Sequence, residues 1–376
     1  MKLYEWAAKD ILKRRYGIPV PDAHRVQTPD EARVAAEDLG GAVVVKSQIL
    51  SGGRGKAGGI RFAASPDEAH GLSLDLLGQR IRGLEVRDLL VERRLDIRDH
   101  LYLGLAVDGS ARLPLLIFST RGGVDIEEVP DREIFRRPLN LEEAQRPGFW
   151  PKLMAEAAEG RGLSAGVVAK VAGVAEALYR AFVENDAELL EINPLAVTPE
   201  GEVWAVDARM TVDDDALWRH PELPRFEEGT PLEQRVKALG LSFVELDGDI
   251  AVMANGAGIT MATIDVLARF GGRAANFLDA GGGAGVEATA AAIEVLLGTR
   301  PRAILINIFG GIARCDDVAR AVVQVKEQKG IPVPLVVRLA GTNQEQGVEI
   351  LRQAGLMAYQ TMEEAARAAV AAARGG

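Results

Sequence analysis

The last third of the chain repeats a strand–glycine–helix pattern that constrains the fold more than any other feature. From about residue 245, short apolar runs end in glycine and lead into segments with helical spacing: IAVMANG (250–256), AANFLDAGG (274–282), RAILINIFGG (302–311) and VPLVVRLAG (333–341). Apolar strands that alternate with helices are typical of a parallel sheet covered on both faces. The pattern predicts a doubly wound parallel α/β domain with its site at the carboxyl ends of the strands.

The preceding part of the chain mixes antiparallel-strand and helical signals. An amphipathic helix is expected before the Gly17–Pro19 break, and a helix-rich stretch covers 152–185. The expected strands are VVVK (43–46), DLLVERR (88–94), LYLGLAV (101–107), PLLIFS (114–119), AELLEINPLAV (187–197) and EVWAVDARM (202–210). The polar segment 219–236 contains three prolines and is the best boundary, so we expect two domains, 1–232 and 233–376.

Composition limits the class of protein. The net charge of −10, from 44 basic and 54 acidic residues, argues against nonspecific binding to nucleic acid or to an anionic membrane. Cys315 is the only cysteine, which excludes a disulfide framework and cysteine-ligated zinc and favours a reducing compartment. No apolar run approaches the roughly 18 residues that a membrane-spanning helix needs, so we expect a cytoplasmic protein.

The segment 43–60, VVVKSQILSGGRGKAGGI, carries the strongest signal for ligand binding. A β-branched run with Lys46 leads into a loop with five glycines, Arg54 and Lys56. Glycine lets backbone N–H groups approach an oxyanion, and the cations add charge-assisted hydrogen bonds. This combination indicates a triphosphate site, and the alternative is a solvated surface loop. The sequence matches neither the P-loop nor the dinucleotide-binding pattern.

A predicted hairpin in the first domain offers a metal site. Its strands flank TPEG (198–201), a strong turn signal. If the residue numbers of cross-strand partners sum to 400, Asn193 faces Asp207 and Glu191 faces Arg209. Directly opposed side chains have Cβ atoms about 4.5–5.5 Å apart, so Asn193 and Asp207 could share one hard cation. One carboxylate, one amide oxygen and substrate phosphates are typical ligands of Mg²⁺.

Two other interpretations of this region stay open. The hairpin could be purely structural, since a slip of one residue in its register would separate the two side chains. The acidic run Asp213–Asp215 is a rival metal site, but a solvated turn explains it better.

The segment NIFGGIARCDDVARAVVQV (307–325) predicts a strand, a Gly-Gly turn and a helix. The free N–H groups of a first helical turn, with the positive end of the helix dipole, form an anion site that suits a phosphoryl group. Asp316 and Asp317 are expected in that first turn, where they stabilise the helix. The alternative is a plain βα turn, and Cys315 is expected to be a packing residue.

These motifs converge on one family. The chain resembles the ATP-grasp β subunits of succinyl-CoA synthetases essentially from end to end. The resemblance is carried by VVVKSQ with GGRGKAGG (43–59), STRGGVDIE (119–127), LLEINPL (189–195), NGAGITMAT (255–263), NFLDAGGG (276–283), NIFGGIARCD (307–316) and VVRLAGTN (336–343). Each motif alone is weak, but seven in order are specific.

The resemblance implies an α/β protein with an N-terminal ATP-grasp domain of two lobes, followed by a flavodoxin-like CoA-ligase domain. It implies an acid–thiol ligase of the tricarboxylic acid cycle. Such an enzyme makes succinyl-CoA reversibly from succinate, CoA and ATP or GTP, with Mg²⁺, through a phosphohistidine.

The resemblance also implies roles for single residues. The nucleotide phosphates would contact Lys46, Gly53, Arg54 and Gly55. Glu92 would lie at the base or ribose, Asn193 and Asp207 match the Mg²⁺ positions, and Glu191 would face the phosphohistidine. The acyl substrate and phosphate would bind in the second domain at Asn255, Gly311, Ile312 and Ala313.

Two departures from the family affect the nucleotide. Family members carry a glutamate near the nucleotide where this chain has His100, and Leu95 replaces a small polar residue in the same segment. Both residues leave the choice between ATP and GTP open. They do not touch the phosphate or metal positions.

A phosphohistidine enzyme needs a histidine near its second site. The histidines of this chain all precede residue 221; they are His24, His70, His100 and His220. We therefore expect a partner to supply the carrier histidine, which fits the α subunit of the family, the source also of most of the CoA site. The chain alone would be catalytically incomplete, and the sequence leaves αβ and α2β2 assemblies open.

Three rival functions remain at the sequence level. The nearest is a β subunit of a related acid–CoA ligase, such as a malate–CoA ligase. Another takes NGAGITMA (255–262) as a dinucleotide fingerprint of an NAD-linked oxidoreductase, although no acidic residue follows at the right place until Asp279. The third is a non-catalytic scaffold subunit. The sequence does not fix the physiological direction of the reaction.

Overall fold

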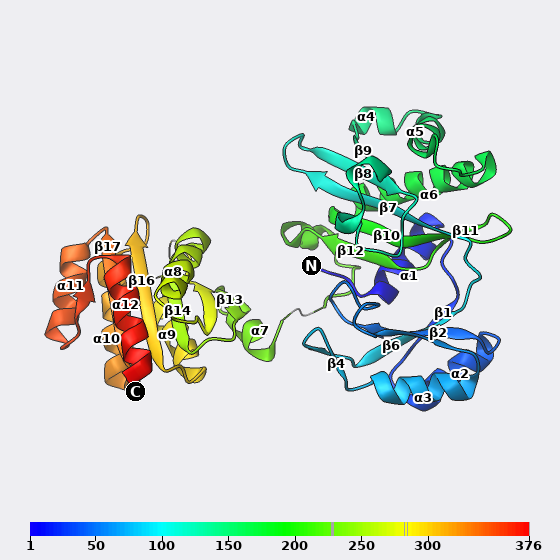
Figure 1. Cartoon of the computed structure of the whole chain (residues 1–376). Coiled ribbons are helices and arrows are strands. Elements are labelled where there is room, and N and C mark those ends of the chain that lie inside the picture. Colours follow the sequence, from blue (N-terminus) through cyan, green and yellow to red (C-terminus); the bar gives the residue numbers. More distant parts are fainter. Residues whose placement is uncertain (227–228, 282, 284, 376) are drawn as a thin grey trace. The chain divides into compact units, whose positions relative to one another are not determined.

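The computed structural model describes residues 1–226, 229–281, 283 and 285–375 (Figure 1). The chain forms two compact units, Met1–Phe226 and Glu227–Gly376.

The first unit begins with a small antiparallel sheet of order β1-β6-β2-β3. Its strands are β1 (Ala23–Val26), β2 (Val43–Gln48), β3 (Ile60–Ala63) and β6 (Asp88–Arg93). The helices α2 (Pro29–Asp38) and α3 (Pro66–Leu76) pack on one face and share its core, and a short hairpin of β4 (Arg80–Ile81) and β5 (Leu84–Glu85) follows α3. Every position of β2 is buried. Since side chains alternate along a strand, Val43 and Val45 face the helices and Lys46 faces the other way.

The second sheet of this unit has the order β11-β10-β7-β8-β9, and β12 also pairs with β10. Its strands are β7 (Asp99–Asp108), β8 (Leu113–Ser119), β9 (Ile134–Pro138), β10 (Ala187–Val197), β11 (Val203–Ala205) and β12 (Ala208–Val212). The predicted register is confirmed, because Leu195 pairs with Ala205 and Glu191 with Arg209. The partners' numbers sum to 400, as the hairpin argument required.

Helices cover this sheet with one apolar core. They are α1 (Glu5–Tyr16), α4 (Leu141–Ala144), α5 (Phe149–Ala158) and α6 (Ala165–Glu184), with 3-10 turns at η1 (Ile126–Glu128), η2 (Asp131–Glu133) and η3 (Asp214–Arg219). The predicted N-terminal helix is confirmed as α1, which ends at Gly17 in the left-handed conformation. Among the described residues, no helix combines the length and the apolar composition required to cross a membrane.

The sequence predicted one strand over 202–210, and this prediction is wrong. The structure has two strands, β11 and β12, separated by Val206 and Asp207. The carbonyl of Val206 accepts hydrogen bonds from two buried lysine ammonium groups. The side chains that fill the space between the two sheets therefore interrupt the strand.

The second unit is a doubly wound sheet of order β13-β15-β14-β16-β17-β18. Its strands are β13 (Ser242–Glu245), β14 (Ile250–Ala254), β15 (Asn276–Asp279), β16 (Ala303–Gly310), β17 (Leu335–Gly341) and β18 (Ala358–Tyr359). All neighbours pair in parallel except β13, an antiparallel edge strand. The predicted parallel fold is confirmed. Its parallel strands follow the flavodoxin-like order 2-1-3-4-5.

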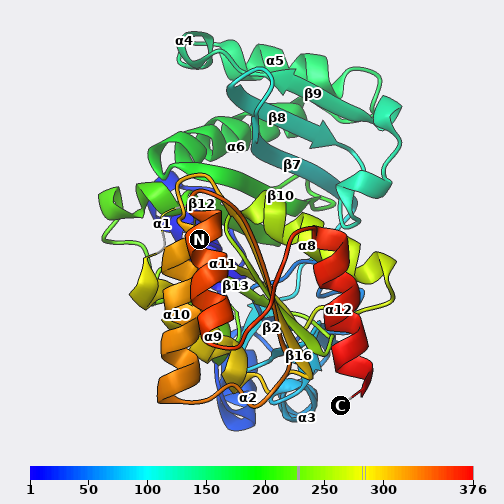
Figure 2. The same cartoon turned by 90° about the vertical axis from the view of Figure 1, so that its left-hand side faces the viewer.

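Helices cover both faces of this sheet (Figure 2). One face carries α9 (Val286–Gly298), α10 (Cys315–Gln328) and α11 (Gln344–Gln353), and the other carries α8 (Ala257–Arg269) and α12 (Met362–Gly375). The helix α7 (Pro231–Lys237) begins at a capping box of Thr230 and Glu233 and packs by Val236 into the core that also holds Phe243. The boundary expected from the sequence, between 232 and 233, lies within α7.

A buried amide replaces part of the ladder between β14 and β15. The Asn276 side chain accepts a hydrogen bond from the Val252 N–H at 3.2 Å and donates one to the Val252 carbonyl at 2.8 Å. Asn276 is fully buried. One side chain therefore satisfies both polar groups of a central-strand residue.

We predict that Asn276→Ala destabilises the protein strongly. The substitution leaves a buried donor and a buried acceptor unpaired, and each costs about 1–3 kcal/mol. Calorimetric melting of the full chain measures the loss of stability. The control is Gln328→Ala, which removes an exposed amide in the same unit. If the Asn276→Ala variant melted at the same temperature as the Gln328→Ala variant, the proposed role of Asn276 in pairing the Val252 backbone would be contradicted.

Candidate functional site

Lys46 lies at the centre of a buried cluster of charged groups in the first unit. Its ammonium donates to Glu5 Oε1 at 3.0 Å, to Glu92 Oε1 at 2.7 Å and to the carbonyl of Val206 at 2.7 Å. The residue is only 2% exposed. Burial alone would lower the pKa of Lys46, but the carboxylates of Glu5 and Glu92 raise it above its ordinary value. Lys46 is therefore a fixed cation inside the protein.

Lys9 of α1 contacts the same acceptors as Lys46. Its ammonium bonds to Glu5 Oε1 at 3.3 Å, to the Val206 carbonyl at 2.6 Å and to Glu92 Oε2. Sequence reasoning missed both Glu5 and Lys9. The signal was present, because residues 5, 8, 9 and 12 fall on one face of a helix and two of the four are apolar. A carboxylate and an ammonium within an apolar stripe indicate a buried ion pair.

Arg54 connects the glycine-rich loop to this cluster. Its Nη2 lies 2.9 and 3.0 Å from the carboxylate oxygens of Asp207 and 2.8 Å from Glu5 Oε2, and its Nη1 donates to the Ser47 carbonyl at 3.0 Å. The Arg54 side chain is 8% exposed and the Asp207 side chain 29% exposed. Asp207 therefore has the most exposed side chain of the cluster.

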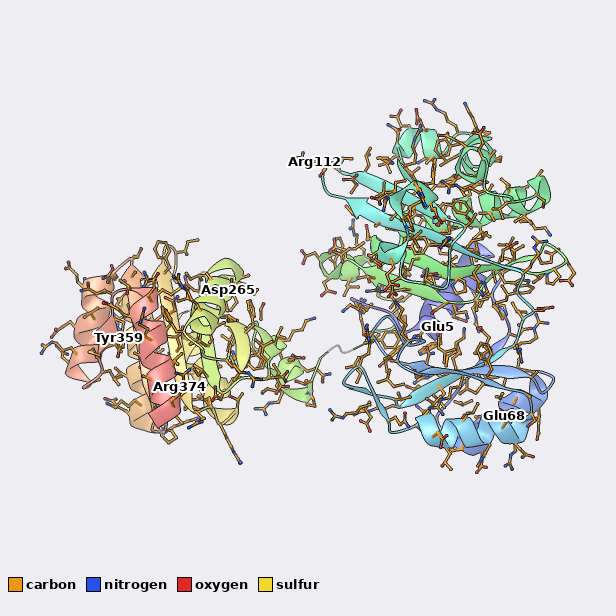
Figure 3. The ribbon with its side chains drawn as sticks, in the orientation of Figure 1. Glu5, Glu68, Arg112, Asp265, Tyr359 and Arg374 are labelled. Atoms are coloured by element: carbon orange, nitrogen blue, oxygen red, sulfur yellow. The ribbon has the colours of Figure 1, made fainter. Side chains whose placement is uncertain are left out.

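The charges of the cluster balance. Three cations, Lys9, Lys46 and Arg54, meet three carboxylates, Glu5, Glu92 and Asp207. Burial would raise the pKa of Glu5, but the three cations hold it well below its ordinary value. Figure 3 labels Glu5, which lies between the two sheets of the first unit.

The glycine-rich loop contributes Arg54 to this cluster and bonds through Lys56 to a second loop. Gly53 has φ +70°, a conformation that L side chains rarely adopt, and a Cβ on Gly59 would lie 2.3 Å from Ser47 Oγ. The ammonium of Lys56 donates to Asp125 Oδ2 at 2.7 Å and to Glu128 Oε1 at 2.8 Å. The loop is therefore bound to the segment that follows β8.

That same segment holds Asn193, the other predicted metal ligand. Asn193 Oδ1 accepts from the Gly123 N–H at 2.6 Å, and its Nδ2 donates to the Val124 carbonyl at 2.9 Å. The Asn193 N–H donates to the Asp207 carbonyl at 3.3 Å, as expected for opposed positions. An amide oxygen and a carboxylate are hard oxygen donors, so the chemistry of the pair fits Mg²⁺.

The remaining residues predicted to contact the nucleotide differ in how deeply they are buried. Glu92 is 1% exposed, behind Lys46, whereas Leu95 is half-buried and His100 is exposed. The His100 carbonyl accepts from the N–H of Gly122, so His100 lies beside the loop that holds Asn193. Only His100 and Leu95 are open to solvent among these three.

Glu191 lies on β10 opposite Gly104 of β7. The Tyr102 hydroxyl donates to Glu191 Oε2 at 2.8 Å, and Arg209 Nη1 lies 3.8 Å from Glu191 Oε1. A Cβ on Gly104 would lie 2.8 Å from the Tyr102 hydroxyl, so the glycine makes room for the ring. Burial raises the pKa of Glu191, and the bonds from Tyr102 and the charge of Arg209 lower it in part.

The second unit gathers its predicted residues where the strand order reverses, between β14 and β16. Asn255, just after β14, donates to the Phe309 carbonyl and accepts from the Phe309 N–H, both at 2.8 Å. After β16 the chain turns at Gly311–Ala313, where Ile312 is 85% exposed and Ala313 is buried. Ligands of open α/β sheets bind at such a switch point.

The helix after this turn, α10, has the predicted acidic first turn. Asp316 accepts from Arg314, Arg320 and Asn343. The bonds from Arg314, with those of the other two residues, lower the pKa of Asp316. Cys315 is buried, as predicted for a packing residue, and burial raises the pKa of its thiol.

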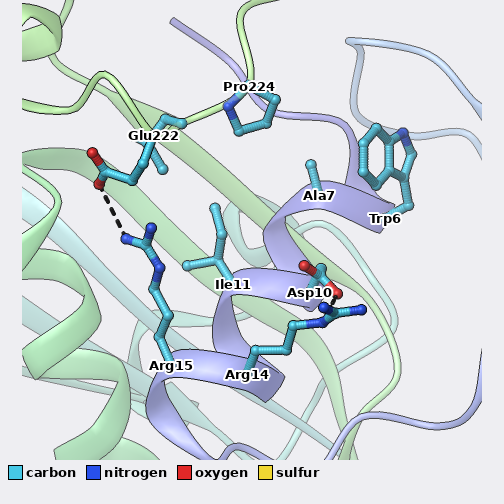
Figure 4. Close-up of a pocket in the computed structure, with 9 residues that line it drawn as sticks. Trp6, Ala7, Asp10, Ile11, Arg14, Arg15, Glu222 and Pro224 are labelled. Atoms are coloured by element: carbon cyan, nitrogen blue, oxygen red, sulfur yellow. Dashed lines mark hydrogen bonds and ion pairs between the residues drawn. The ribbon is translucent and has the colours of Figure 1, made fainter.

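A separate hollow lies on the other side of α1 (Figure 4). It has a volume of about 150 Å³ and is lined by Trp6, Ala7, Asp10, Ile11, Arg14, Arg15, Glu222, Leu223 and Pro224. Arg15 pairs with Glu222 at 3.1 Å and Arg14 with Asp10 at 2.6 Å. Its cations are thus matched by carboxylates, and it takes no part in the charged cluster.

Comparison with known proteins agrees with both units. Two family profiles match the chain: an ATP-grasp domain over residues 2–197 and a CoA-ligase domain over residues 253–372. The chain is 46% identical to the succinate–CoA ligase [ADP-forming] β subunit of Rubrobacter xylanophilus, and both proteins are covered in full. It is 44% identical to the protein of that name from Chloroflexus aurantiacus and 41% identical to that of Pyrobaculum arsenaticum, again with full coverage of each.

Among solved structures, an ATP citrate lyase from Methanothrix soehngenii, in complex with citrate and coenzyme A, aligns with a TM-score of 0.73. The alignment covers 98% of this chain and 99% of that one at 19% identity. At this identity the likeness concerns the fold alone.

We predict that Tyr102→Phe raises the pKa of the Glu191 carboxyl. The lost hydroxyl donates to the carboxylate, so its removal disfavours the charged form. The ¹³C chemical shift of the Glu191 carboxyl, followed against pH, gives the pKa, with Tyr4→Phe elsewhere in the unit as control. An unchanged or lower pKa in the Tyr102→Phe variant would show that the hydrogen bond does not act on Glu191.

Proposed function

The chain belongs to the family of succinate–CoA ligase β subunits, acid–thiol ligases that form succinyl-CoA from succinate, CoA and a nucleoside triphosphate, and we propose a role for each unit. The first unit would bind the nucleotide and pass on its terminal phosphoryl group. The second unit would hold the acyl substrate and the phosphoryl group. As a β subunit the chain works with an α subunit.

One observation carries the proposal for the first unit: Arg54 of the glycine-rich loop joins a buried charged cluster that also holds Lys46. Lys46 and Arg54 are held by carboxylates in a balanced cluster, and Asp207 of that cluster is partly open to solvent. Phosphate oxygens can take the place of carboxylate oxygens as acceptors for such cations. The backbone N–H groups of Gly53 and Gly55, on either side of Arg54, would add donors to the phosphates.

Asn193 and Asp207 would hold Mg²⁺ together with the nucleotide phosphates. When bound, the metal neutralises phosphate charge and orients the terminal phosphoryl group. Both carboxylate oxygens of Asp207 accept from Arg54 Nη2, so the guanidinium would move from Asp207 to a phosphate where Asp207 holds the metal. Asn193 is already fixed by two bonds to the backbone of the 123–124 loop.

The carrier of the phosphoryl group would be a histidine of the α subunit, because none of the four histidines of this chain lies in the second unit. Glu191 has the environment of a residue that receives an imidazole, since its carboxylate is fixed by Tyr102 and partly exposed. An anionic Glu191 would orient the imidazole and stabilise positive charge on it.

In the second unit, the proposed acyl and phosphate site is the turn Gly311–Ala313 with Asn255. The position at the topological switch point supports it, as does the α10 N-terminus that follows. A loaded histidine from the partner would meet the carboxylate of succinate here. Attack of CoA on the resulting acyl phosphate completes the thioester and releases phosphate.

Three finer points belong to this proposal. The acid is succinate, with malate or a related dicarboxylate as the alternative. The nucleotide is ATP or GTP, with His100 and Leu95 as the residues that would set the preference. The α subunit would supply most of the CoA site, in an αβ or α2β2 complex.

The experiment is a phosphate-transfer assay. The native complex is incubated with Mg²⁺ and γ-labelled ATP or GTP, and the subunits are separated and counted for acid-labile phosphate. Label on the partner that is discharged by succinate and CoA supports the proposal and identifies the nucleotide. Discharge by a different acid moves the substrate, and no label with either nucleotide overturns the mechanism.

We predict that Asp207→Ala lowers the rate of phosphohistidine formation from nucleotide by at least roughly a hundredfold, because the variant loses the carboxylate proposed for the metal. The same labelling assay measures the rate. Asp38→Ala, an exposed acidic residue of α2, is the control. Labelling of the partner at the wild-type rate by the Asp207→Ala protein would refute the metal assignment.

A further inference from the structure

Two lysines of the first unit share one set of acceptors. Lys9 and Lys46 both bond to Glu5 Oε1, to the carboxylate of Glu92 and to the carbonyl of Val206. Lys9 is 3% exposed and Lys46 2%. Lys46 alone is enough to present a cation from β2 to the proposed phosphates. The second ammonium, that of Lys9, therefore needs a separate explanation.

If nucleotide phosphates bind Lys46 and Arg54, as proposed above, only one of these two lysines changes its partners. Phosphates held by Lys46 and Arg54 would take over hydrogen bonds that run to Glu5, Glu92 and Asp207 in the structure. Asp207 would hold Mg²⁺ in exchange. Glu5 and Glu92, whose side chains are 1% exposed, gain nothing and would remain as buried carboxylates with weakened compensation. A buried charge that loses its partner is strongly destabilising.

Lys9 is the remaining cation in contact with both carboxylates among the described residues. It comes from α1, whose residues Ala8 and Leu12 are fully buried, and the chain just before α1 is bound by the Leu3 N–H to the Met210 carbonyl at 2.9 Å. Its ammonium is also fixed at the Val206 carbonyl, in the break between β11 and β12. Lys9 is therefore held in place by the fold and does not depend on the ligand.

We propose that Lys9 is a positioning residue for the nucleotide site: its fixed ammonium compensates Glu5 and Glu92, so that Lys46 and Arg54 are free to exchange carboxylates for phosphates. The proposal rests on the proposed function, since it takes Lys46 and Arg54 as phosphate ligands. It adds α1 to the machinery of nucleotide binding.

The test compares two lysines of the same helix. Lys9→Met leaves the cluster with an excess negative charge and Lys46 shared by two carboxylates, so the dissociation constant of MgADP or MgGDP should rise by roughly tenfold or more. Lys13→Met, on α1 but paired with Asp22 at the surface, removes the same charge outside the cluster and should leave the constant unchanged. Isothermal titration of the native complex measures both.

A second variant separates charge compensation from packing. In Lys9→Met/Glu5→Gln the cluster is again neutral, and Lys46 has one carboxylate partner, Glu92. The proposal expects nucleotide affinity to recover toward the wild type, although a contact between side chains has been lost. If Lys9 acted only through packing, the double variant would bind no better than Lys9→Met, and the proposal would be wrong. The double variant decides the question even if Lys9→Met fails to give a cooperative melting transition.

A third variant, Lys46→Met, distinguishes a failure of the proposed nucleotide site from a failure of the proposed role of Lys9. If Lys46→Met binds nucleotide like the wild type, the proposed nucleotide site itself is wrong. If Lys46→Met loses nucleotide and Lys9→Met keeps wild-type affinity, the proposed function stands and the role of Lys9 is refuted.

Discussion

The first unit depends on burying equal numbers of opposite charges between its two sheets. Three carboxylates and three cations come from α1, β2, β6, the glycine-rich loop and the break between β11 and β12. Each charge would be costly alone, and the cost is offset only when all partners are in place. The cluster therefore fixes the approach of the two sheets and, by the same contacts, assembles the side chains that a nucleotide would need.

The irregular parts of the fold follow from this cluster. The strand expected over 202–210 is interrupted because the Val206 carbonyl serves two lysines and the Asp207 carboxylate serves Arg54. The segment 121–128 makes two further sets of contacts. Its backbone at Gly123 and Val124 bonds to Asn193, and its side chains Asp125 and Glu128 bond to Lys56. The glycine-rich loop and Asn193, the proposed metal ligand, are therefore both bound to the same segment.

More of the second unit than of the first could be predicted from the sequence. Its parallel strands β14, β15, β16 and β17 were predictable because each belongs to a short apolar run that leads to glycine, a pattern that depends only on local burial. The fifth parallel strand, β18, was not predicted, since it has only the two residues Ala358–Tyr359. The antiparallel strand β13 was not expected, because Ser242–Glu245 is mostly exposed and carries little apolar signal. The site residues lie after β14 and β16, where the strand order reverses, so the topology brings Asn255 to Phe309, at the end of β16 just before the Gly311–Ala313 turn.

The sequence by itself determined the N-terminal helix, four parallel strands of the second unit, the order of the two domains, the hairpin register and the family. These follow from periodicity, turn residues and motifs, which are properties of neighbouring residues. Only the tertiary structure decided that Glu5 and Lys9 join Lys46, and that Arg54 bonds to Asp207. Compensation of a buried charge depends on which distant residues share its low-dielectric surroundings, and no local pattern records that.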